Sequence, residues 1–365
     1  MNILIIAGEV SGDLYAAHLA AELKSQHSKC NLFAIGGEKL NKESDQFIFE
    51  STHKHGVGIE GKFTKRHYQN QLLNSIKTVI NTTNLTKVII VDFQHYNYLI
   101  AKLIPKTIPI YTFITPNFWM WKSVSQAKKI TTYSTKIFTI FEQEYLFYSQ
   151  LSKNCFYYGH PLTEILDTSP LNSSSKIPQI TLLPGSRPQE FKLYFLTMLK
   201  TMQQLQLSNS NFNLVICVSS NKYSSTINTY LKNFPNLNYD LSHNATTTEI
   251  KKSTLVIAAS GSTTLEVILL NKPLIVLAAL PKLSYFIAKY ILRIKLPFIS
   301  LPNFITKKEI VLELIQSQIT VKNLYKHVTN TLQNPNKNLK LYPEVCKKLV
   351  TKNKIFKNIA NEILK

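Results

Sequence analysis

The sequence predicts an α/β protein built from two Rossmann-like halves, and three observations support this. Short apolar runs alternate with helix-like stretches along most of the chain, which is typical of parallel βαβ units. Two of these runs, at residues 2–7 and 180–183, end abruptly in a glycine-bearing turn that a helical pattern follows. A chain of 365 residues is also long for one hydrophobic core and sufficient for two domains.

Composition shifts divide the chain into four parts. Residues 1–167 are expected to form the first Rossmann-like domain, and residues 179–335 the second. The segment 168–178 is rich in Ser and Pro, which is typical of a linker. Residues 336–365 form a basic tail that we expect to be helical.

The strands of each half can be placed from the apolar runs. In the first half we expect strands at residues 2–7, 32–37, 87–91, 108–114 and 136–141. Residues 72–79 have helical spacing, and the polar, His-bearing stretch 38–65 is expected to be mostly loop. In the second half we expect strands at residues 180–183, 212–218, 254–258 and 273–277. From about residue 310 onward, helices are expected to dominate.

Composition limits the class of protein and its compartment. The formal net charge is +21, from 42 Lys and Arg against 21 Asp and Glu, and such a field attracts polyanions and phosphorylated substrates. A genome of biased base composition would give the same excess of Lys without any such function. The four cysteines lack paired spacing, which argues against disulfides and a zinc site and favours a reducing cytoplasm. The sequence shows no secretory signal and no apolar run of the roughly 20 residues that a membrane span needs.

Two turns in the second half have the properties of a phosphate site. Gly185, Ser186 and Arg187 follow an apolar run and precede a helical pattern, so backbone N–H groups, a helix dipole and a guanidinium would converge there. Ser260, Gly261, Ser262 and Glu266 repeat this arrangement, with a carboxylate able to accept hydrogen bonds from ribose hydroxyls. Taken singly, the first motif also reads as a plain turn, and Glu266 as a first-turn glutamate stabilised by the helix dipole.

With these motifs in place, the chain resembles the lipid-A-disaccharide synthases, which are inverting glycosyltransferases of the GT-B architecture. In that architecture two Rossmann-like domains face each other across a cleft, and C-terminal helices follow. Seven segments carry the resemblance in the family's order, at residues 7–13, 35–39, 114–121, 159–162, 182–190, 260–266 and 300–316. The resemblance implies transfer of 2,3-diacylglucosamine from UDP-2,3-diacylglucosamine to the 6-hydroxyl of 2,3-diacylglucosamine 1-phosphate. The products would be the β-1,6 lipid A disaccharide and UDP.

The resemblance also implies roles for particular residues. Inversion needs a base for the acceptor proton, and Asp92, after a buried strand, matches the family's proposed base. The donor UDP would contact Gly185, Ser186, Arg187, Ser260, Gly261, Ser262, Glu266, Asn303 and Gln316. The acceptor side would include Gly8, Glu9, Ser11, Gly12, Asp13, His95, Asn97, Trp121 and His160. The scheme requires neither a metal nor a cofactor.

Three of these residues have plainer alternatives. Asp13 could simply cap a helix, Trp121 could belong to the core, and His160 could be a satisfied structural histidine. Where relatives read Asp-Ala-Pro-Asp-Phe-Asn, this chain reads Asp-Phe-Gln-His-Tyr-Asn at residues 92–97, so His95 replaces the second aspartate. We assign the base to Asp92 alone, although a histidine there could share the work.

Membrane contact is expected from two features. The substrates carry acyl chains, and residues 282–293 form a basic amphipathic pattern suited to an anionic bilayer, or equally to a domain core. The segment 55–61 is more polar than the apolar segment of relatives. We expect a cytoplasmic protein that associates peripherally with the inner face of the cytoplasmic membrane and does not bind nucleic acid. The sequence is compatible with a monomer or a homodimer.

Two other functions are alternatives to the synthase. One is an enzyme like UDP-N-acetylglucosamine 2-epimerase, and the other is a non-catalytic polyanion-binding protein.

Overall fold

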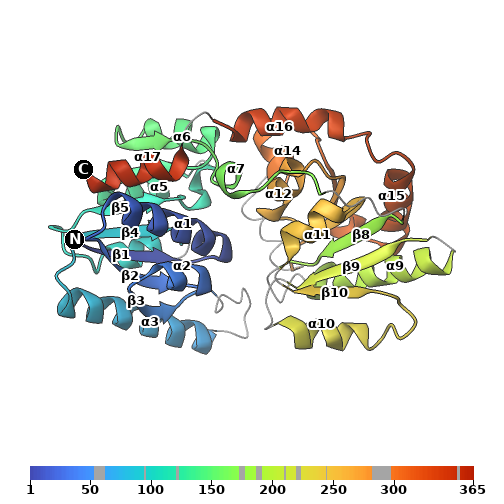
Figure 1. The fold of residues 1–365 in the computed structure, drawn as a ribbon, viewed down its shortest axis with the longest axis horizontal. Helices are drawn as coiled ribbons and strands as arrows, with labels where there is room; N and C mark the ends of the chain where they lie inside the picture. Colours follow the sequence, from blue (N-terminus) through green and yellow to red (C-terminus); the bar gives the residue numbers. More distant parts are fainter. Residues whose placement is uncertain are drawn as a thin grey trace. The chain divides into compact units, whose positions relative to one another are not determined.

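The computed structural model describes residues 1–52, 62–93, 96–120, 123–171, 177–185, 191–208, 211–218, 223–243, 245–281, 297–351 and 354–365. Its backbone contacts separate two compact units. Unit 1 comprises Met1–Ile165 and Leu349–Lys365, and unit 2 comprises Leu166–Lys348. Each unit is a parallel sheet covered by helices, as the sequence predicts (Figure 1).

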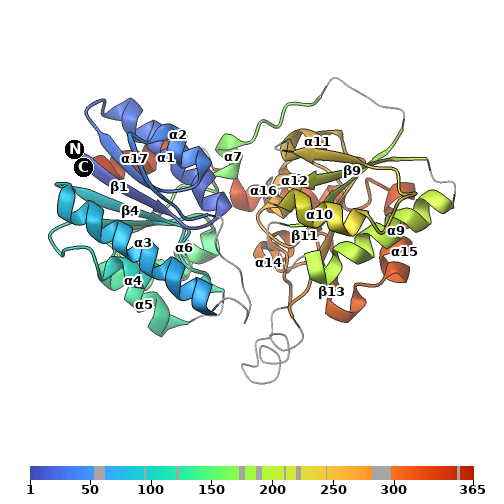
Figure 2. The ribbon, with the colours of Figure 1, turned by 90° about the horizontal axis from the view of Figure 1, so that it is seen from below.

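Unit 1 is built on a sheet of seven strands in the order β3-β2-β1-β4-β5-β6-β7. The strands are β1 Asn2–Ala7, β2 Asn31–Gly36, β3 Gln46–Glu50, β4 Lys87–Val91, β5 Ile110–Phe113, β6 Lys136–Thr139 and β7 Cys155–Tyr157. The helices are α1 Val10–Gln26, α2 Glu38–Glu43, α3 Lys62–Thr82, α4 Asn97–Ala101, α5 Val124–Tyr133, α6 Glu142–Ser149, α7 Leu162–Ile165 and α17 Ile355–Leu364, with a 3-10 turn η2 at Asn117–Trp119. In Figure 2, α1, α2 and α17 lie on one face of this sheet, and α3, α4 and α5 lie on the other.

The alternation of side chains along the central strands explains these two layers. Leu4 and Ile6 of β1 join a buried cluster with Leu72 and Ile76 of α3. Their neighbours point to the opposite face, since successive residues of a strand alternate. Both faces of the central strands are therefore covered, which is why β1 and β4 read as continuous apolar runs.

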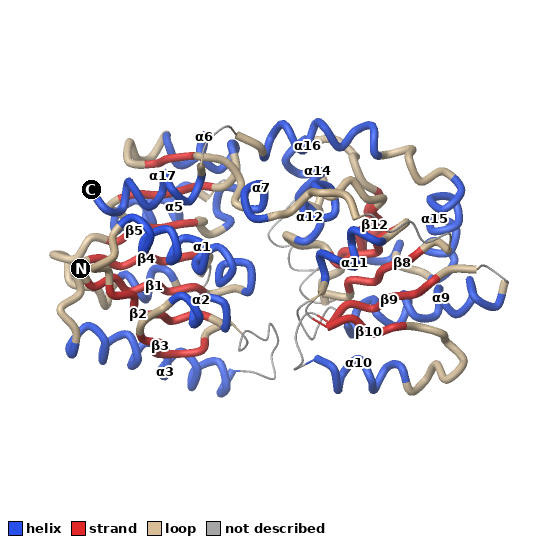
Figure 3. The backbone as a smooth tube through the Cα atoms, viewed as in Figure 1, coloured by secondary structure: helices blue, strands red, loops and turns tan. Residues whose placement is uncertain are grey.

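Unit 2 repeats this plan with six strands in the order β10-β9-β8-β11-β12-β13. The strands are β8 Gln179–Leu183, β9 Asn213–Val218, β10 Asp240–His243, β11 Leu255–Ala259, β12 Leu274–Ala278 and β13 Leu312–Ile315 (Figure 3). The helices are α9 Leu196–Leu207, α10 Ser224–Leu231, α11 Thr246–Lys252, α12 Thr263–Leu269, α14 Leu301–Thr306, α15 Val321–Gln333 and α16 Tyr342–Leu349. A π-helical turn η3 at Phe191–Phe195 and 3-10 turns η6 at Gln316–Gln318 and η7 at Leu339–Leu341 complete it.

The strands predicted from apolar runs are confirmed, with boundaries that shift by one or two residues. The prediction that residues 38–65 are mostly loop is wrong, because this stretch contains α2, the strand β3 and the start of α3. Helices α15, α16 and α17 dominate after residue 310 as predicted, and residues 312–315 form the short strand β13, which the sequence does not predict. β3 and β13 are edge strands of partly exposed residues, so neither has the continuous apolar run by which a buried strand is recognised.

The C-terminal segment is divided between the two units. Tyr342, at the start of α16, donates a hydrogen bond to the Lys272 carbonyl of unit 2 at 3.0 Å. α17 instead packs on α1 of unit 1, where Phe356 stacks on His18 with ring centroids 5.4 Å apart. The ammonium groups of Lys87 and Lys136 bind carbonyl oxygens in its last turn, at Ile363 and Glu362. Cations are favourable at a helix C-terminus, so the sheet anchors the end of the chain.

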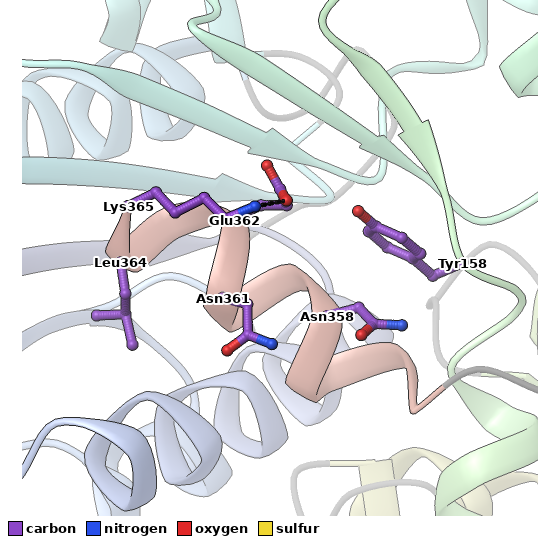
Figure 4. Close-up of a pocket in the computed structure, with 6 residues that line it drawn as sticks. All are labelled: Tyr158, Asn358, Asn361, Glu362, Leu364 and Lys365. Carbon is purple, nitrogen blue, oxygen red and sulfur yellow. Dashed lines mark hydrogen bonds and ion pairs between the residues drawn. The ribbon is translucent and has the colours of Figure 1, made fainter.

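The outer side of α17 forms a pocket of about 580 Å³ with Tyr158. Figure 4 shows Asn358, Asn361 and Glu362 lining it from this helix. None of the helices in the described ranges combines the length and apolar character of a membrane span. The four cysteines are free thiols.

Candidate active site

Each sheet has one topological switch point, where the order of its strands reverses direction. In unit 1 it lies between β1 and β4, and in unit 2 between β8 and β11. Ligands of open α/β sheets bind beyond the carboxyl ends of the strands at such points. The residues that follow these four strands are Gly8, Asp92, Pro184 and Ser260, so the predicted site motifs of both halves lie at the switch points.

In unit 1, the loop after β1 lies directly against the end of β4. The N–H of Gly8 donates to the Val91 carbonyl at 3.2 Å, and the Ser11 hydroxyl donates to Asp92 Oδ2 at 3.1 Å. A Cβ on Gly12 would lie 2.9 Å from the Asp92 Cβ, and one on Gly8 would lie 2.0 Å from the Phe93 ring. Side chains are therefore excluded at both glycines because the loop must approach the carboxylate closely.

Asp92 itself adopts a left-handed backbone conformation with φ of 44°. Its N–H donates to the Phe113 carbonyl of β5 at 3.0 Å, and the residue is 8% exposed. Non-glycine residues are uncommon in this conformation and concentrate at functional sites. The sheet thus places the Asp92 carboxylate, which accepts from the Ser11 hydroxyl, at the carboxyl edge of the central strands.

The carboxylate of Asp13 accepts hydrogen bonds from backbone groups of its own unit. The donors are the N–H groups of Gly37, Lys39 and Leu40, at 2.6, 3.0 and 3.2 Å. These are the N-terminal amides of α2, so Asp13 on α1 caps a different helix from its own. Burial raises the pKa of Asp13 above its ordinary value, and the three donors oppose this rise. Glu9 is half-buried at the N-cap of α1, where its carbonyl accepts from the Asp13 N–H.

Asn97 and His160 are both buried on the acceptor side. Asn97 begins α4 and is 1% exposed, and neither polar atom of its side-chain amide has a hydrogen-bond partner among the residues that the structure describes. His160 is also 1% exposed, and its Nδ1 accepts from the Leu162 N–H at 3.3 Å. Burial lowers the pKa of His160 to about 3, so the ring is neutral near pH 7. His95 and Trp121 lie outside the described residues.

In unit 2, the backbone at the switch point is open to a ligand. Gly185 follows β8 with φ of 104°, a conformation that favours glycine, while Ser186 and Arg187 lie outside the described residues. Gly261 is exposed, and a Cβ placed on it would meet no atom within 4 Å. The half-buried Ser260 and Ser262 flank it just before α12. This loop can accommodate a phosphate against its backbone.

Glu266 and Gln316 lie at the same edge of the second sheet. Glu266 is half-buried in α12 and accepts a hydrogen bond from the Thr247 hydroxyl of α11. Gln316 directly follows β13 with φ of 53°, and its side-chain amide bridges the backbone of Leu280, accepting from the N–H at 2.9 Å. The loops after β12 and β13 are thereby tied together.

The side-chain amide of Asn303 forms hydrogen bonds within its own unit. It is fully buried, its Oδ1 accepts from the N–H groups of Ile310 and Val311, and its Nδ2 donates to Glu313 at 2.7 Å. Glu313 also accepts from the N–H and hydroxyl of Ser300. Asn303 therefore shapes the loop before α14 and has no hydrogen-bonding capacity left for a ligand in this arrangement.

A comparison with protein families identifies the family of the chain. The family model for lipid-A-disaccharide synthetase matches residues 3–364. The chain belongs to this family. One similar relative is the lipid-A-disaccharide synthase of Synechocystis, with 29% identity over 93% of this chain and 91% of the relative. Another is lipid-A-disaccharide synthase 1 of Legionella pneumophila strain Paris, with 26% identity over 95% of this chain and 92% of the relative. The protein is therefore an enzyme of the glycosyltransferase class.

Solved structures show the fold of this synthetase-family enzyme. MurG of Acinetobacter baumannii matches with a TM-score of 0.55 and 13% identity over 100% of this chain and 99% of its own. UDP-GlcNAc 2-epimerase of Neisseria meningitidis, bound to UDP-GlcNAc, matches with a TM-score of 0.64 and 12% identity over 100% and 98%. These likenesses establish the two-domain GT-B fold.

Three residues behind the edge have no role predicted from the sequence. Glu144 and Thr115 of unit 1, and Glu313 of unit 2, form hydrogen-bonded braces there. Thr115 and Glu313 lie in segments that resemble the family, whereas Glu144 lies outside them. The only sequence signal for Glu144 is its place in the first turn of a helix, a position common for glutamate in any protein. Within the described ranges, no three His, Cys, Asp or Glu side chains gather as metal ligands would.

Proposed function

We propose that this enzyme transfers 2,3-diacylglucosamine from UDP-2,3-diacylglucosamine to the 6-hydroxyl of 2,3-diacylglucosamine 1-phosphate. The match of the family model to residues 3–364 carries this proposal. The arrangement at the two switch points supports it, since one unit presents a carboxylate and the other an open, glycine-bearing loop. The products are the β-1,6-linked lipid A disaccharide and UDP.

Asp92 is the base of this reaction. Its carboxylate takes the proton of the acceptor 6-hydroxyl as that oxygen attacks the anomeric carbon, and the bond from that carbon to UDP breaks with inversion. Ser11 donates to one carboxylate oxygen at 3.1 Å, which orients the group toward the acceptor. The lack of side chains at Gly8 and Gly12 lets the chain after β1 pack directly against Phe93 and Asp92.

The second unit holds the departing UDP. Its diphosphate lies against the backbone at Gly185, Ser186 and the loop 260–262, with Arg187 neutralising the growing charge. Glu266 accepts from the ribose hydroxyls, exchanging its contact with Thr247 for them. Gln316 fixes the loop edge, and Asn303 acts behind it by shaping the turn before α14. The transfer proceeds without a metal.

The test is conversion of the two lipid substrates by the purified protein, followed by mass spectrometry of the disaccharide 1-phosphate. Asp92→Asn is expected to lower kcat by about 100-fold or more, since general-base catalysis contributes that much. Asp45→Asn is the matched control, because Asp45 lies at the amino end of β3, where it pairs with Lys24. Full activity in Asp92→Asn would move the base elsewhere, with His95 the next candidate.

Further arms of the same assay separate the alternatives. Chelation by EDTA is expected to leave the rate unchanged. Turnover of UDP-N-acetylglucosamine in place of disaccharide formation would identify an epimerase, and salt-sensitive nucleic-acid binding without UDP binding would identify a polyanion-binding protein. We also propose peripheral association with the inner face of the cytoplasmic membrane, to be tested by co-sedimentation with anionic vesicles. The segment 282–293 that suggests it lies outside the described residues.

A further inference from the structure

The turn that follows β5 has an unusual backbone. Ile114 has φ of 64° and is 7% exposed. A β-branched residue in the left-handed region is a genuine outlier, because its side chain crowds the backbone there. Such a conformation costs about 1–3 kcal/mol and persists only where surrounding contacts enforce it. The contacts that enforce this one should therefore be identifiable.

A single buried carboxylate supplies most of them. Glu144 Oε1 accepts from the N–H and hydroxyl of Thr115, the residue after Ile114, at 3.0 and 2.5 Å. Its Oε2 accepts from the N–H groups of Ile140 and Phe141, which follow β6, at 2.9 and 3.3 Å. Glu144 and Thr115 are each 1% exposed. One side chain thus joins the turns that follow two neighbouring strands.

This brace is linked to the proposed base through one residue. Phe113, directly before Ile114, accepts from the Asp92 N–H at 3.0 Å, and the Ile114 N–H donates to the Phe138 carbonyl of β6 at 2.9 Å. A shift of the turn at Ile114 would therefore pull on the backbone that sets the left-handed conformation of Asp92. Misplacement of a reacting group by about 1 Å can cost about 100-fold in rate.

We propose that Glu144 is a positioning residue for the transfer reaction, because it fixes the strained turn after β5 and thereby the backbone of Asp92. The inference rests on the proposed function. An ionised Glu144 can accept all four hydrogen bonds, and its charge strengthens each of them. A neutral Glu144 loses that charge, and only the Thr115 hydroxyl among its four partners can accept the added hydrogen, by reversing its own bond. Protonation therefore loosens the brace without removing any side chain.

The surroundings of Glu144 make its charge sensitive to pH. Burial raises its pKa to about 7, against the effect of its four donors. The titratable groups around it are Tyr148 on the same helix and Cys155 and Tyr157 on β7. Burial raises the pKa of each, to about 12 for Cys155 and Tyr157, so all three are neutral at pH 7.

The test compares Glu144→Gln with Glu142→Gln, which removes the same charge from the first turn of the same helix. Glu144→Gln is expected to lower kcat by roughly 10–100-fold while leaving the KM for the UDP-sugar unchanged. The wild type should lose rate as the pH falls through about 7, and this limb should be absent in Glu144→Gln. Glu142→Gln should retain the kcat and the pH profile of the wild type.

A second pair of variants guards against a folding defect. Thr115→Val removes the hydroxyl that donates a hydrogen bond to Glu144, whereas Thr115→Ser retains that hydroxyl. Only Thr115→Val should therefore lower kcat. Hydrogen exchange at the amides of Thr115, Ile140 and Phe141 should accelerate in Glu144→Gln. Wild-type kcat and pH profile in Glu144→Gln, or equal kcat in the two Thr115 variants, would overturn the proposal. If the wild type forms no disaccharide, the proposed function fails, and hydrogen exchange still decides whether Glu144 fixes the turn.

Discussion

Removal of the Phe356 side chain tests whether the C-terminal helix is part of unit 1. Phe356 lies in α17, is 4% exposed and stacks on His18 of α1. It also meets Phe113 of β5 edge-to-face, with ring centroids 6.5 Å apart. The ring therefore joins the last helix both to the first helix and to the strand beside the proposed base.

The expected magnitude follows from the volume that the substitution empties. Phe356→Ala deletes a buried ring from a close-packed site, which typically costs about 3–5 kcal/mol. For a unit of roughly 180 residues, each kcal/mol lowers the Tm by about 2–4 °C. The Tm of unit 1 should therefore fall by about 6–20 °C.

The assay uses the position of the tryptophans. The chain has two, Trp119 and Trp121, and both lie within the sequence range of unit 1, so tryptophan fluorescence reports its unfolding alone. Lys357→Ala is the control, since Lys357 is an exposed neighbour on the same helix and should change stability by less than about 0.5 kcal/mol. An unchanged fluorescence transition in Phe356→Ala would refute the packing of α17 on unit 1.

Four further predictions concern the carboxyl edge of unit 1. Gly12→Ala should lower kcat by roughly 10–100-fold, because the added Cβ would lie 2.9 Å from the Asp92 Cβ and displace it. Steady-state kinetics measure this effect, and a kcat equal to that of the wild type would contradict the prediction. Asp13→Asn should destabilise unit 1 by about 2–4 kcal/mol through the loss of charged acceptors, seen as a lower denaturation midpoint by tryptophan fluorescence. The depressed pKa of His160, about 3, means that the unfolded state binds more protons below pH 6.5, so stability is lost as pH falls. The raised pKa of Glu144, about 7, has the opposite effect: between about pH 4.5 and 7 the folded state binds more protons, so acidification stabilises it. Glu144→Gln lacks this contribution, so its free energy of unfolding should fall by up to about 1.4 kcal/mol more per pH unit than that of the wild type. Denaturation curves of both proteins at pH 7 and pH 5.5 measure the difference.

The sequence predicts the sheets well where strands are buried on both faces. β1 and β4 are continuous apolar runs, and their ends mark the switch point at which Asp92 lies. Edge strands such as β3 carry no such signal, because half of their surface faces solvent. Strand order also rests on pairings between distant segments, which local periodicity does not encode.

The site is predictable only where the chemistry shows in residue type and spacing. The glycines, Ser11 and Asp92 could be placed because a strand, a turn and a helix leave few positions for them. The partners of Asp13 and Asn303 could not, because a carboxylate that caps a distant helix has the same sequence signature as one that binds substrate. Only the three-dimensional hydrogen-bond network separates the two roles.

This separation has a physical basis in the cost of buried charge. A carboxylate behind the sheet edge is tolerable when several N–H or hydroxyl groups satisfy it, as at the buried Asp13 and Glu144 and the half-buried Glu313. Each of these carboxylates accepts hydrogen bonds from a turn in which some backbone N–H groups have no partner within a helix or strand, because a strand ends there and a loop begins. Asp92 lies at the end of a central strand, where the Ser11 hydroxyl donates to its carboxylate. Mutation of one of the bracing carboxylates of unit 1 should therefore change the rate through the geometry of the turns around Asp92, the proposed base.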